Sequence, residues 1–139
     1  MSTLERAIAL AAAAHAGQTD KAGAPYILHV LRVMLRLETA EERMAAVMHD
    51  MVEDCGWTLE QLRAEGFSEA VVNGVDAVTR RDSESYEEFV LRAKAHPVGR
   101  RVKLADLEDN SDTSRLSEIT PRDQARLEKY RRAMEALSS

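Results

Sequence analysis

Hydrophobic residues recur three and four positions apart along most of the chain, which is the spacing of an α-helix buried along one face. Two segments, 27–37 and 44–52, are hydrophobic nearly all round, so both are expected to be helices at the centre of the fold. The one-sided spacing is clearest near the two ends, in Leu4, Ala7, Ile8 and Ala11 and again in Leu127, Tyr130, Met134 and Leu137.

Signals for helix starts divide this pattern into elements. Thr120 precedes Pro121, as a cap residue precedes a proline at the first helical position. A Ser or Thr followed three residues later by Glu or Gln, the spacing of a capping box, occurs at Ser2, Thr39, Thr58 and Ser85. The sequence therefore predicts an all-α fold, a single compact bundle of about seven to eight helices, with long connections at 17–25 and 111–121. The expected helices lie near 3–16, 26–37, 40–54, 58–65, 68–79, 85–95, 98–110 and 121–137.

Length and charge limit the classes of function. The chain has 139 residues, which predicts one domain over 1–139. Its net charge of −5 argues against a nucleic-acid partner. No apolar run approaches the roughly 20 residues of a membrane-spanning helix, and the charged start 1–6 does not resemble a signal peptide. The single cysteine, Cys55, rules out an internal disulfide and fits a reducing compartment, so we expect a cytoplasmic protein.

The predicted central helix 40–54 ends in an unusual group of polar residues. His49, Asp50, Glu53 and Asp54 fall within six residues on a segment whose other residues indicate burial. Burying unpaired charge costs on the order of several kcal/mol per group, so a compensating charge is required. His49 and Glu53 are four residues apart, as are Asp50 and Asp54, and each pair projects from one side of the helix. A single divalent metal ion would compensate these charges.

Two further polar residues interrupt hydrophobic segments in the same way. His29 lies within an apolar stretch and so does Asp106, which makes a His/His/Asp/Asp set with His49 and Asp50. Histidine and carboxylate ligands suit zinc, manganese or iron, with positions left open for water and substrate. Around Asp106, Lys103 precedes by three residues and Asn110 follows by four, so one helical face presents a cation, a carboxylate and an amide. This face suits a phosphate near a metal.

A structural role is the simpler interpretation of each residue taken alone. His29 would then be a hydrogen-bonded core histidine, and Asp106 a capping or ion-pairing residue. The segment 49–54 would be a partly solvated helix end paired with arginines. Polar residues interrupt hydrophobic segments at three places, His29, Asp106 and 49–54, and this combination favours the metal site over three separate explanations.

Five segments also follow, in order, the motifs of a known family: Ala14–Gln18, Lys21–His29, His49–Asp54, Ala77–Arg80 and Lys103–Asn110. In this order they resemble the HD superfamily, specifically the hydrolase domain of the RelA/SpoT type and its small stand-alone relatives. The resemblance spans roughly residues 4–137. It implies an all-α fold with one catalytic metal, usually Mn²⁺.

The resemblance also implies a role for individual residues. The implied metal ligands are His29, His49, Asp50 and Asp106. Glu53 and Asp54 would orient and deprotonate the attacking water. Asn110 and Thr113 would line the nucleotide pocket, while Lys21 would meet the phosphates, and Lys103, with Arg80 or Arg81, would stabilise pyrophosphate.

The substrate that the resemblance implies is the small nucleotide (p)ppGpp, whose 3′-pyrophosphate is removed. The family commonly has an Arg-Lys pair before the first metal histidine, with the Arg packed against guanine, and this chain has Asp20 and Lys21. A carboxylate cannot replace that cation stacking. Leu107 also replaces an Arg that the family favours. One alternative is therefore an HD phosphohydrolase of another nucleotide or phosphate ester, and a second is a non-catalytic nucleotide-sensing module.

Overall fold

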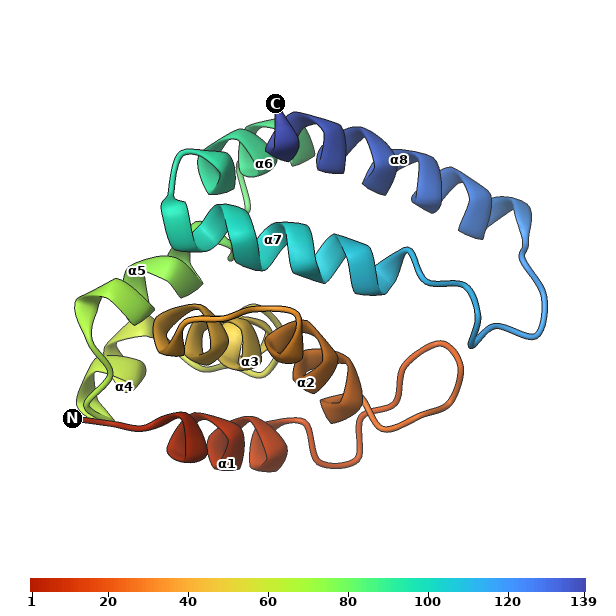
Figure 1. Cartoon of the computed structure of the whole chain (residues 1–139). Helices are drawn as coiled ribbons and strands as arrows, with labels where there is room; N and C mark the ends of the chain where they lie inside the picture. Colours follow the sequence, from red (N-terminus) through yellow and green to blue (C-terminus); the bar gives the residue numbers. More distant parts are fainter.

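Eight α-helices joined by loops form the chain, which a computed structural model describes over all 139 residues (Figure 1). The all-α prediction is confirmed, and each expected helix is present with bounds that differ by a few residues at most. The helices are α1 (Leu4–Ala14), α2 (Ile27–Leu35), α3 (Ala40–Asp54), α4 (Leu59–Ala64), α5 (Glu69–Ala77), α6 (Tyr86–Lys94), α7 (Pro97–Asn110) and α8 (Pro121–Ser138).

Side-chain caps begin most of these helices where the sequence predicts. Complete capping boxes, with both reciprocal hydrogen bonds, occur at Thr39, Thr58, Ser85 and Thr120. The prediction of a cap at Ser2 is wrong, because Thr3 is the N-cap of α1 and accepts a 3.1 Å hydrogen bond from the Arg6 N–H. The Ser2 N–H instead donates to the Gly66 carbonyl, which ties the chain start to the connection between α4 and α5.

The core is built around α3, which packs against α1, α2, α5 and α7. Its middle is fully buried, with Val47, Met48 and Met51 among the largest side chains that solvent does not reach. A smaller second cluster forms where α6, α7 and α8 meet, and it contains Val90, Leu107, Ala133 and Leu137. Helix α7 contributes to both clusters and so connects the two parts of the molecule (Figure 1).

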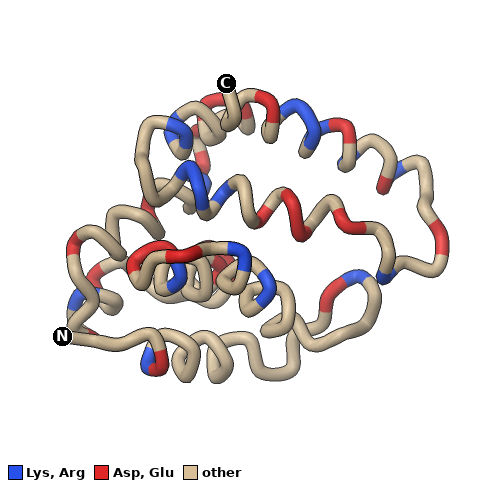
Figure 2. The backbone as a smooth tube through the Cα atoms, viewed as in Figure 1, with Lys and Arg blue, Asp and Glu red and all other residues tan.

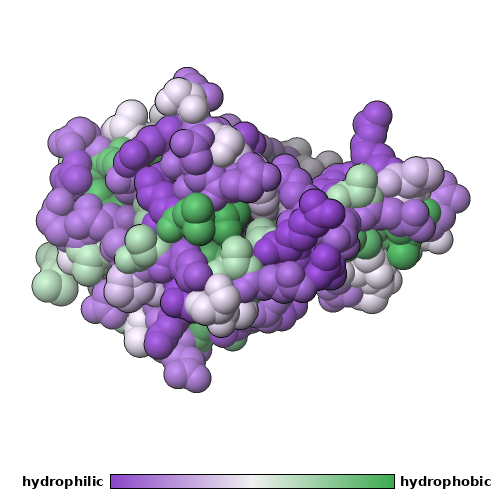
Figure 3. Space-filling model, turned by 90° about the horizontal axis from the view of Figure 1, so that it is seen from above, coloured by the Kyte–Doolittle hydropathy of each residue, from purple (hydrophilic) through white to green (hydrophobic).

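Burial of the two most hydrophobic helices is less complete than predicted. Helix α2 exposes Leu28 and Leu35, because α3 and α7 cover only part of its surface. On α3, His49 and Asp50 are buried, whereas Glu53 and Asp54 in the last turn are exposed. The face seen from above is mostly hydrophilic, with small separate hydrophobic patches (Figure 3). None of the helices combines the length and hydrophobicity needed to span a membrane.

Both predicted long connections lie at the same end of the molecule, beside the end of α7 and the start of α8 (Figure 1). The first is closed by an isolated antiparallel bridge between Thr19 and Pro25. Within it, the Asp20 carboxylate accepts hydrogen bonds from the Ala22 and Ala24 N–H groups at 2.9 and 3.0 Å. Residues of both connections line one cavity, which lies next to the candidate site.

Candidate metal centre

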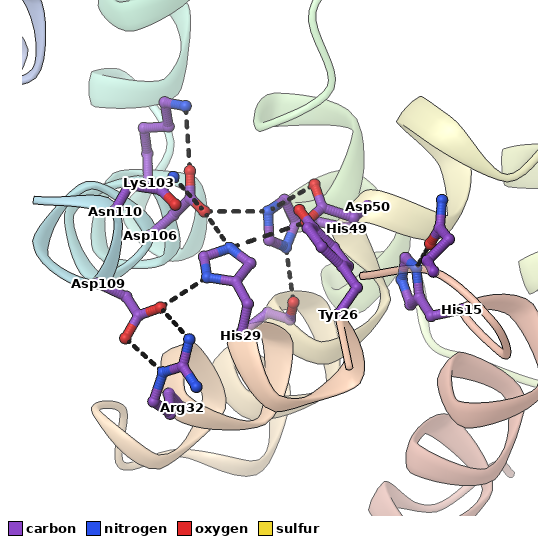
Figure 4. Close-up of polar contacts among 12 residues, drawn as sticks. His15, Tyr26, His29, Arg32, His49, Asp50, Lys103, Asp106, Asp109 and Asn110 are labelled. Carbon is purple, nitrogen blue, oxygen red and sulfur yellow. Dashed lines mark hydrogen bonds and ion pairs between the residues drawn. The ribbon is translucent and has the colours of Figure 1, made fainter. Parts of the chain in front are cut away.

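Four buried side chains from three helices converge on one point (Figure 4). Helix α2 supplies His29, α3 supplies His49 and Asp50, and α7 supplies Asp106. The His29 Nε2 atom lies 3.0 Å from Asp106 Oδ1 and 3.9 Å from Asp50 Oδ2. The His49 Nε2 atom lies 3.1 Å from Asp50 Oδ1 and 3.6 Å from Asp106 Oδ1. The structure thus brings together the four residues that the sequence predicts as metal ligands.

Hydrogen bonds on the far side of each ring fix the orientation of both histidines. The His29 Nδ1–H donates to Asp109 Oδ2 at 2.7 Å. The His49 Nδ1–H donates to the Ala46 carbonyl at 2.6 Å, one turn back along α3. Both Nε2 atoms are therefore turned toward the carboxylates of Asp50 and Asp106. This is the arrangement in which metal-binding histidines are usually held, so the donor set fits a divalent cation.

Sequence reasoning did not identify Asp109, although this carboxylate is fully buried behind His29. Arg32 donates to it through Nε at 2.9 Å and through a second nitrogen at 3.2 Å. A nitrogen of Arg115 lies 3.7 Å from Oδ2 of the same carboxylate. A signal was present in the spacing, because His29 and Arg32 are three residues apart on α2, as Asp106 and Asp109 are on α7.

The electrostatics of the centre favour positive charge at the two Nε2 atoms. Burial alone would lower the pKa of His29, but hydrogen bonds with Asp106 and Asp109 raise this pKa to about 9. Burial likewise opposes charge on His49, yet the adjacent Asp50 carboxylate raises its pKa well above the ordinary value. Burial would raise the pKa of Asp106, but the Lys103 ammonium and both histidines hold it well below its usual range. The carboxylates of Asp50 and Asp106 therefore favour positive charge at this point.

Three polar groups support the two aspartates from outside the cluster. The Tyr26 hydroxyl donates to Asp50 Oδ2 at 2.6 Å, and burial together with the Asp50 charge raises the pKa of this phenol. Lys103 Nζ lies 3.3 Å from Asp106 Oδ2. Asn110 Nδ2 lies 3.4 Å from Asp106 Oδ1. The predicted face of α7 with a cation, a carboxylate and an amide is therefore present, and Tyr26 is an addition that the sequence did not indicate.

Two further carboxylates, Glu53 and Asp54, lie at the exposed rim of the centre. One oxygen of each lies within 4.8 Å of the other and of an Asp50 oxygen. Partial desolvation and the Asp50 charge raise the pKa of both carboxyl groups, although a 3.0 Å hydrogen bond from the Arg80 N–H to Glu53 opposes the shift. These groups are placed to exchange protons with a molecule bound beside Asp50.

A cavity of about 310 Å³ opens beside His29 between the two long connections and α8. Of the residues predicted to bind substrate, Lys21, Asn110 and Thr113 line it, whereas Lys103 lies outside. The cations of the cavity are all paired with carboxylates. These pairs are Lys21 with Asp123, Arg126 with Asp123, Arg32 with Asp109 and Arg115 with Asp112.

A buried cluster of two histidines and two aspartates, where three helices of an all-α fold meet, defines the class of protein. The chain belongs to the HD domain family, whose model matches residues 7–138.

Curated relatives are longer proteins that share this region. The chain is 34% identical to a guanosine-3′,5′-bis(diphosphate) 3′-pyrophosphohydrolase of Aquifex aeolicus, over 79% of this chain and 17% of that protein. It is 35% identical to a probable GTP pyrophosphokinase of Mycobacterium leprae, over 99% of this chain and 19% of that protein. The chain therefore spans less than a fifth of the length of these two relatives.

A solved structure has the same fold. It comes from work describing a metazoan ortholog of SpoT that hydrolyzes ppGpp, and it matches with a TM-score of 0.79 and 22% sequence identity. The match covers 99% of this chain and 85% of that chain.

Proposed function

We propose that this chain is a metal-dependent phosphohydrolase whose divalent ion is held by His29, His49, Asp50 and Asp106. The observation that supports this most directly is the direction of the two histidine rings. Both Nδ1 atoms are engaged in hydrogen bonds, and both Nε2 atoms face carboxylates 3.0–3.1 Å away. Histidine and carboxylate ligands accept several metals, and Mn²⁺ is the ion that the family resemblance favours.

The chemistry follows from the residues around the ion. A divalent ion in this position lowers the pKa of a bound water and neutralises charge on phosphoryl oxygens. Glu53 and Asp54 accept the proton of the attacking water, since both carboxylates lie beside Asp50 and burial increases their basicity. The Tyr26 hydroxyl holds Asp50 in place, and Lys103 does the same for Asp106.

The proposed substrate is (p)ppGpp, from which the 3′-pyrophosphate is removed. One relative that matches this chain is named as a guanosine-3′,5′-bis(diphosphate) 3′-pyrophosphohydrolase, and this supports the proposed substrate. In this proposal Asn110 and Thr113 contact the nucleoside within the 310 Å³ cavity, Lys21 meets its phosphates, and Lys103 acts beside Asp106. The reaction belongs to the cytoplasm, where the thiol of Cys55 would remain reduced.

Asp20 favours a second candidate, the hydrolysis of another nucleotide or phosphate ester. Its carboxylate is hydrogen-bonded to the Ala22 and Ala24 N–H groups and offers no cation to a guanine ring. A nucleotide-sensing module without activity is the third candidate, and the Glu53–Asp54 pair argues against it, because a binding module needs no proton acceptor there.

A product assay on the Mn²⁺-loaded protein tests these candidates. Release of pyrophosphate from ppGpp supports the main proposal, and release of orthophosphate from a nucleoside monophosphate supports the second. Asp50→Ala should abolish turnover and metal binding while the far-ultraviolet circular dichroism stays helical, and Asp82→Ala, an exposed residue away from the centre, should behave as wild type. Absence of bound metal and of activity on every phosphorylated nucleotide would overturn the proposal.

A further inference from the structure

Three cationic side chains from different parts of the chain gather around the ring of Tyr86, the first residue of α6. The Lys129 Nζ atom, from α8, lies 4.0 Å from the ring centroid. Lys103 Nζ, from α7, and Arg80 Cζ, from the connection between α5 and α6, each lie 5.9 Å from it. These four residues are called the Tyr86 cluster below.

The cations of the Tyr86 cluster differ from those of the cavity in their partners. Each cavity cation is paired with a carboxylate, whereas the side chains of Arg80 and Lys129 have no carboxylate partner. The Arg80 guanidinium donates only to the Glu84 carbonyl, at 3.3 Å. Lys103 has a single carboxylate partner, Asp106. The unneutralised positive charge near the centre therefore lies over Tyr86 and not in the cavity.

The Tyr86 cluster adjoins the metal centre. Asp106 connects them, because its Oδ1 atom faces His29 while its Oδ2 atom lies 3.3 Å from Lys103 Nζ. A second link is the 3.0 Å hydrogen bond from the Arg80 N–H to Glu53. Basic residues occupy the first half of α7 and acidic residues the second half, so Lys103 and Asp106 lie near this boundary (Figure 2). An anion held over Tyr86 would be next to the reacting atoms.

The Tyr86 hydroxyl is itself an unusual group. It is buried and has no hydrogen-bond partner in the protein. Burying a hydroxyl without a partner is unfavourable, so such groups are commonly satisfied by a ligand or water. Desolvation raises the pKa of this phenol even though Lys103 is close, so the group remains a donor. A phosphoryl oxygen is a suitable acceptor for it.

We propose that the Tyr86 cluster binds the distal phosphate of a substrate whose scissile group is a pyrophosphoryl group. This proposal rests on the proposed function and adds the residues that distinguish a diphosphate from a monophosphate. Tyr86 is a positioning residue for Lys129, since its ring face holds that ammonium by cation–π attraction. Lys103 lies between this ring and the ring of Phe89, whose centroid is 4.9 Å from Lys103 Nζ. Lys129 and Arg80 then contact the distal phosphate.

The hydrolysis balances with pyrophosphate as product. The water oxygen forms a bond to the phosphorus next to the ribose, and the bond from that phosphorus to the ribose oxygen breaks. The electron pair stays on the ribose oxygen, which ends with the proton that the water loses through Glu53 or Asp54. The distal phosphate keeps its bond to the attacked phosphorus throughout, so cations over Tyr86 hold the whole pyrophosphoryl group.

Two substrates that differ only in the distal phosphate test the proposal: guanosine 5′-diphosphate carrying a 3′-diphosphate or a 3′-monophosphate. Lys129→Ala and Tyr86→Leu should each raise KM for the 3′-diphosphate about tenfold and leave KM for the 3′-monophosphate unchanged. Tyr86→Phe keeps the ring and should raise KM about threefold. Lys94→Ala should match wild type, because this half-buried lysine at the end of α6 contacts Ser139 and lies outside the Tyr86 cluster. Wild-type KM values in both Lys129→Ala and Tyr86→Leu would overturn the proposal.

Calorimetric binding of inorganic pyrophosphate to the Mn²⁺-loaded protein separates this proposal from the proposed function. Lys129→Ala should weaken this binding about tenfold relative to wild type and Lys94→Ala. If ppGpp is not hydrolysed but this pattern is found, the proposed function fails and the Tyr86 cluster stands as a pyrophosphate site. If ppGpp is hydrolysed and Lys129→Ala binds pyrophosphate as wild type does, the Tyr86 cluster alone is overturned.

Discussion

Asp109 supports His29 from behind, with its Oδ2 atom 2.7 Å from the Nδ1 atom of the ring. The two residues are 80 positions apart, and their contact joins α2 to α7 at the candidate metal centre. It leaves Nε2 facing Asp106. Burial alone would raise the pKa of Asp109, but hydrogen bonds from His29 and Arg32 hold this pKa well below the usual range, so the carboxylate stays charged.

Asp109→Asn should weaken metal binding. The amide retains the shape of the side chain but loses the charge that holds the His29 ring and increases the basicity of Nε2. Removing such an outer partner typically lowers metal affinity about 10- to 100-fold. Titration with Mn²⁺, followed by calorimetry or by paramagnetic relaxation, measures the change.

The matched control for this experiment is Asp112→Asn. Asp112 follows α7 closely and also pairs with Arg115, but it does not contact His29. Its replacement should leave Mn²⁺ affinity as in wild type. Equal affinities in the two variants would show that Asp109 does not support the metal site through His29.

Removal of the carboxylates at the rim should separate catalysis from metal binding. Glu53→Gln and Asp54→Asn should each lower kcat by about 10²–10⁴-fold, the usual contribution of a proton acceptor, because the amides cannot accept the proton of the attacking water. Mn²⁺ affinity should change far less than in Asp50→Ala. Steady-state kinetics at saturating Mn²⁺ measure kcat, and a loss of activity that follows metal loss would argue against the proton-transfer role.

The Glu84–Arg92 ion pair makes the free energy of unfolding depend on pH. Hydrogen bonds from Arg92 lower the pKa of Glu84 from 4.5 to about 2. A depressed folded-state pKa means that the stabilisation is complete above the unfolded-state pKa and is lost as the pH falls from about 4.5 toward 2. Glu84→Gln should therefore unfold at lower urea than wild type at about pH 7, and the difference should shrink at about pH 3.

A control for the Glu84 experiment lies on α6. Glu87 is exposed in its first turn and forms no ion pair, so Glu87→Gln should show no such change with pH. If the loss of stability in Glu84→Gln relative to wild type stayed constant from neutral to acid pH, this would contradict its assignment to the Glu84–Arg92 ion pair.

Gly99 of α7 packs tightly against Ala77 at the end of α5. A Cβ atom added there would lie 2.6 Å from Ala77 Cβ and 3.3 Å from His96 Cβ. An alanine usually stabilises a helix by about 1 kcal/mol relative to glycine, but overpacking costs about 1–3 kcal/mol. Gly99→Ala should therefore lower the urea midpoint of unfolding. A raised midpoint would mean that α5 and α7 can move apart to admit the methyl group without a net loss of stability.

Much of the fold could be predicted because its signals are local. The capping boxes at Thr39, Thr58 and Ser85 depend on residues three positions apart, and each occurs as predicted. The site residues His29 and Asp106 stood out since each is a polar group in a hydrophobic segment, and the structure brings them within 3.0 Å.

The remaining features could not be predicted because they depend on how helices pack. The spacing of three residues from Asp106 places Asp109 on the same side of α7, but only the packing of His29 against it distinguishes Asp109 from the other acidic residues there. Tyr26 contacts Asp50 across 24 residues of sequence. The exposure of Leu28 and Leu35 likewise depends on which face of α2 the other helices cover, and this is not encoded in the segment itself.

Asp20 shows how one residue can constrain the evolution of specificity. Its carboxylate closes the loop that precedes α2 through the Ala22 and Ala24 N–H groups, and Lys21 belongs to the same loop. An arginine there would bring a cation to the cavity but would remove both hydrogen bonds at once. The mutational path from this chain to an Arg-Lys loop therefore passes through a loosened loop, unless a second substitution first replaces the lost bonds.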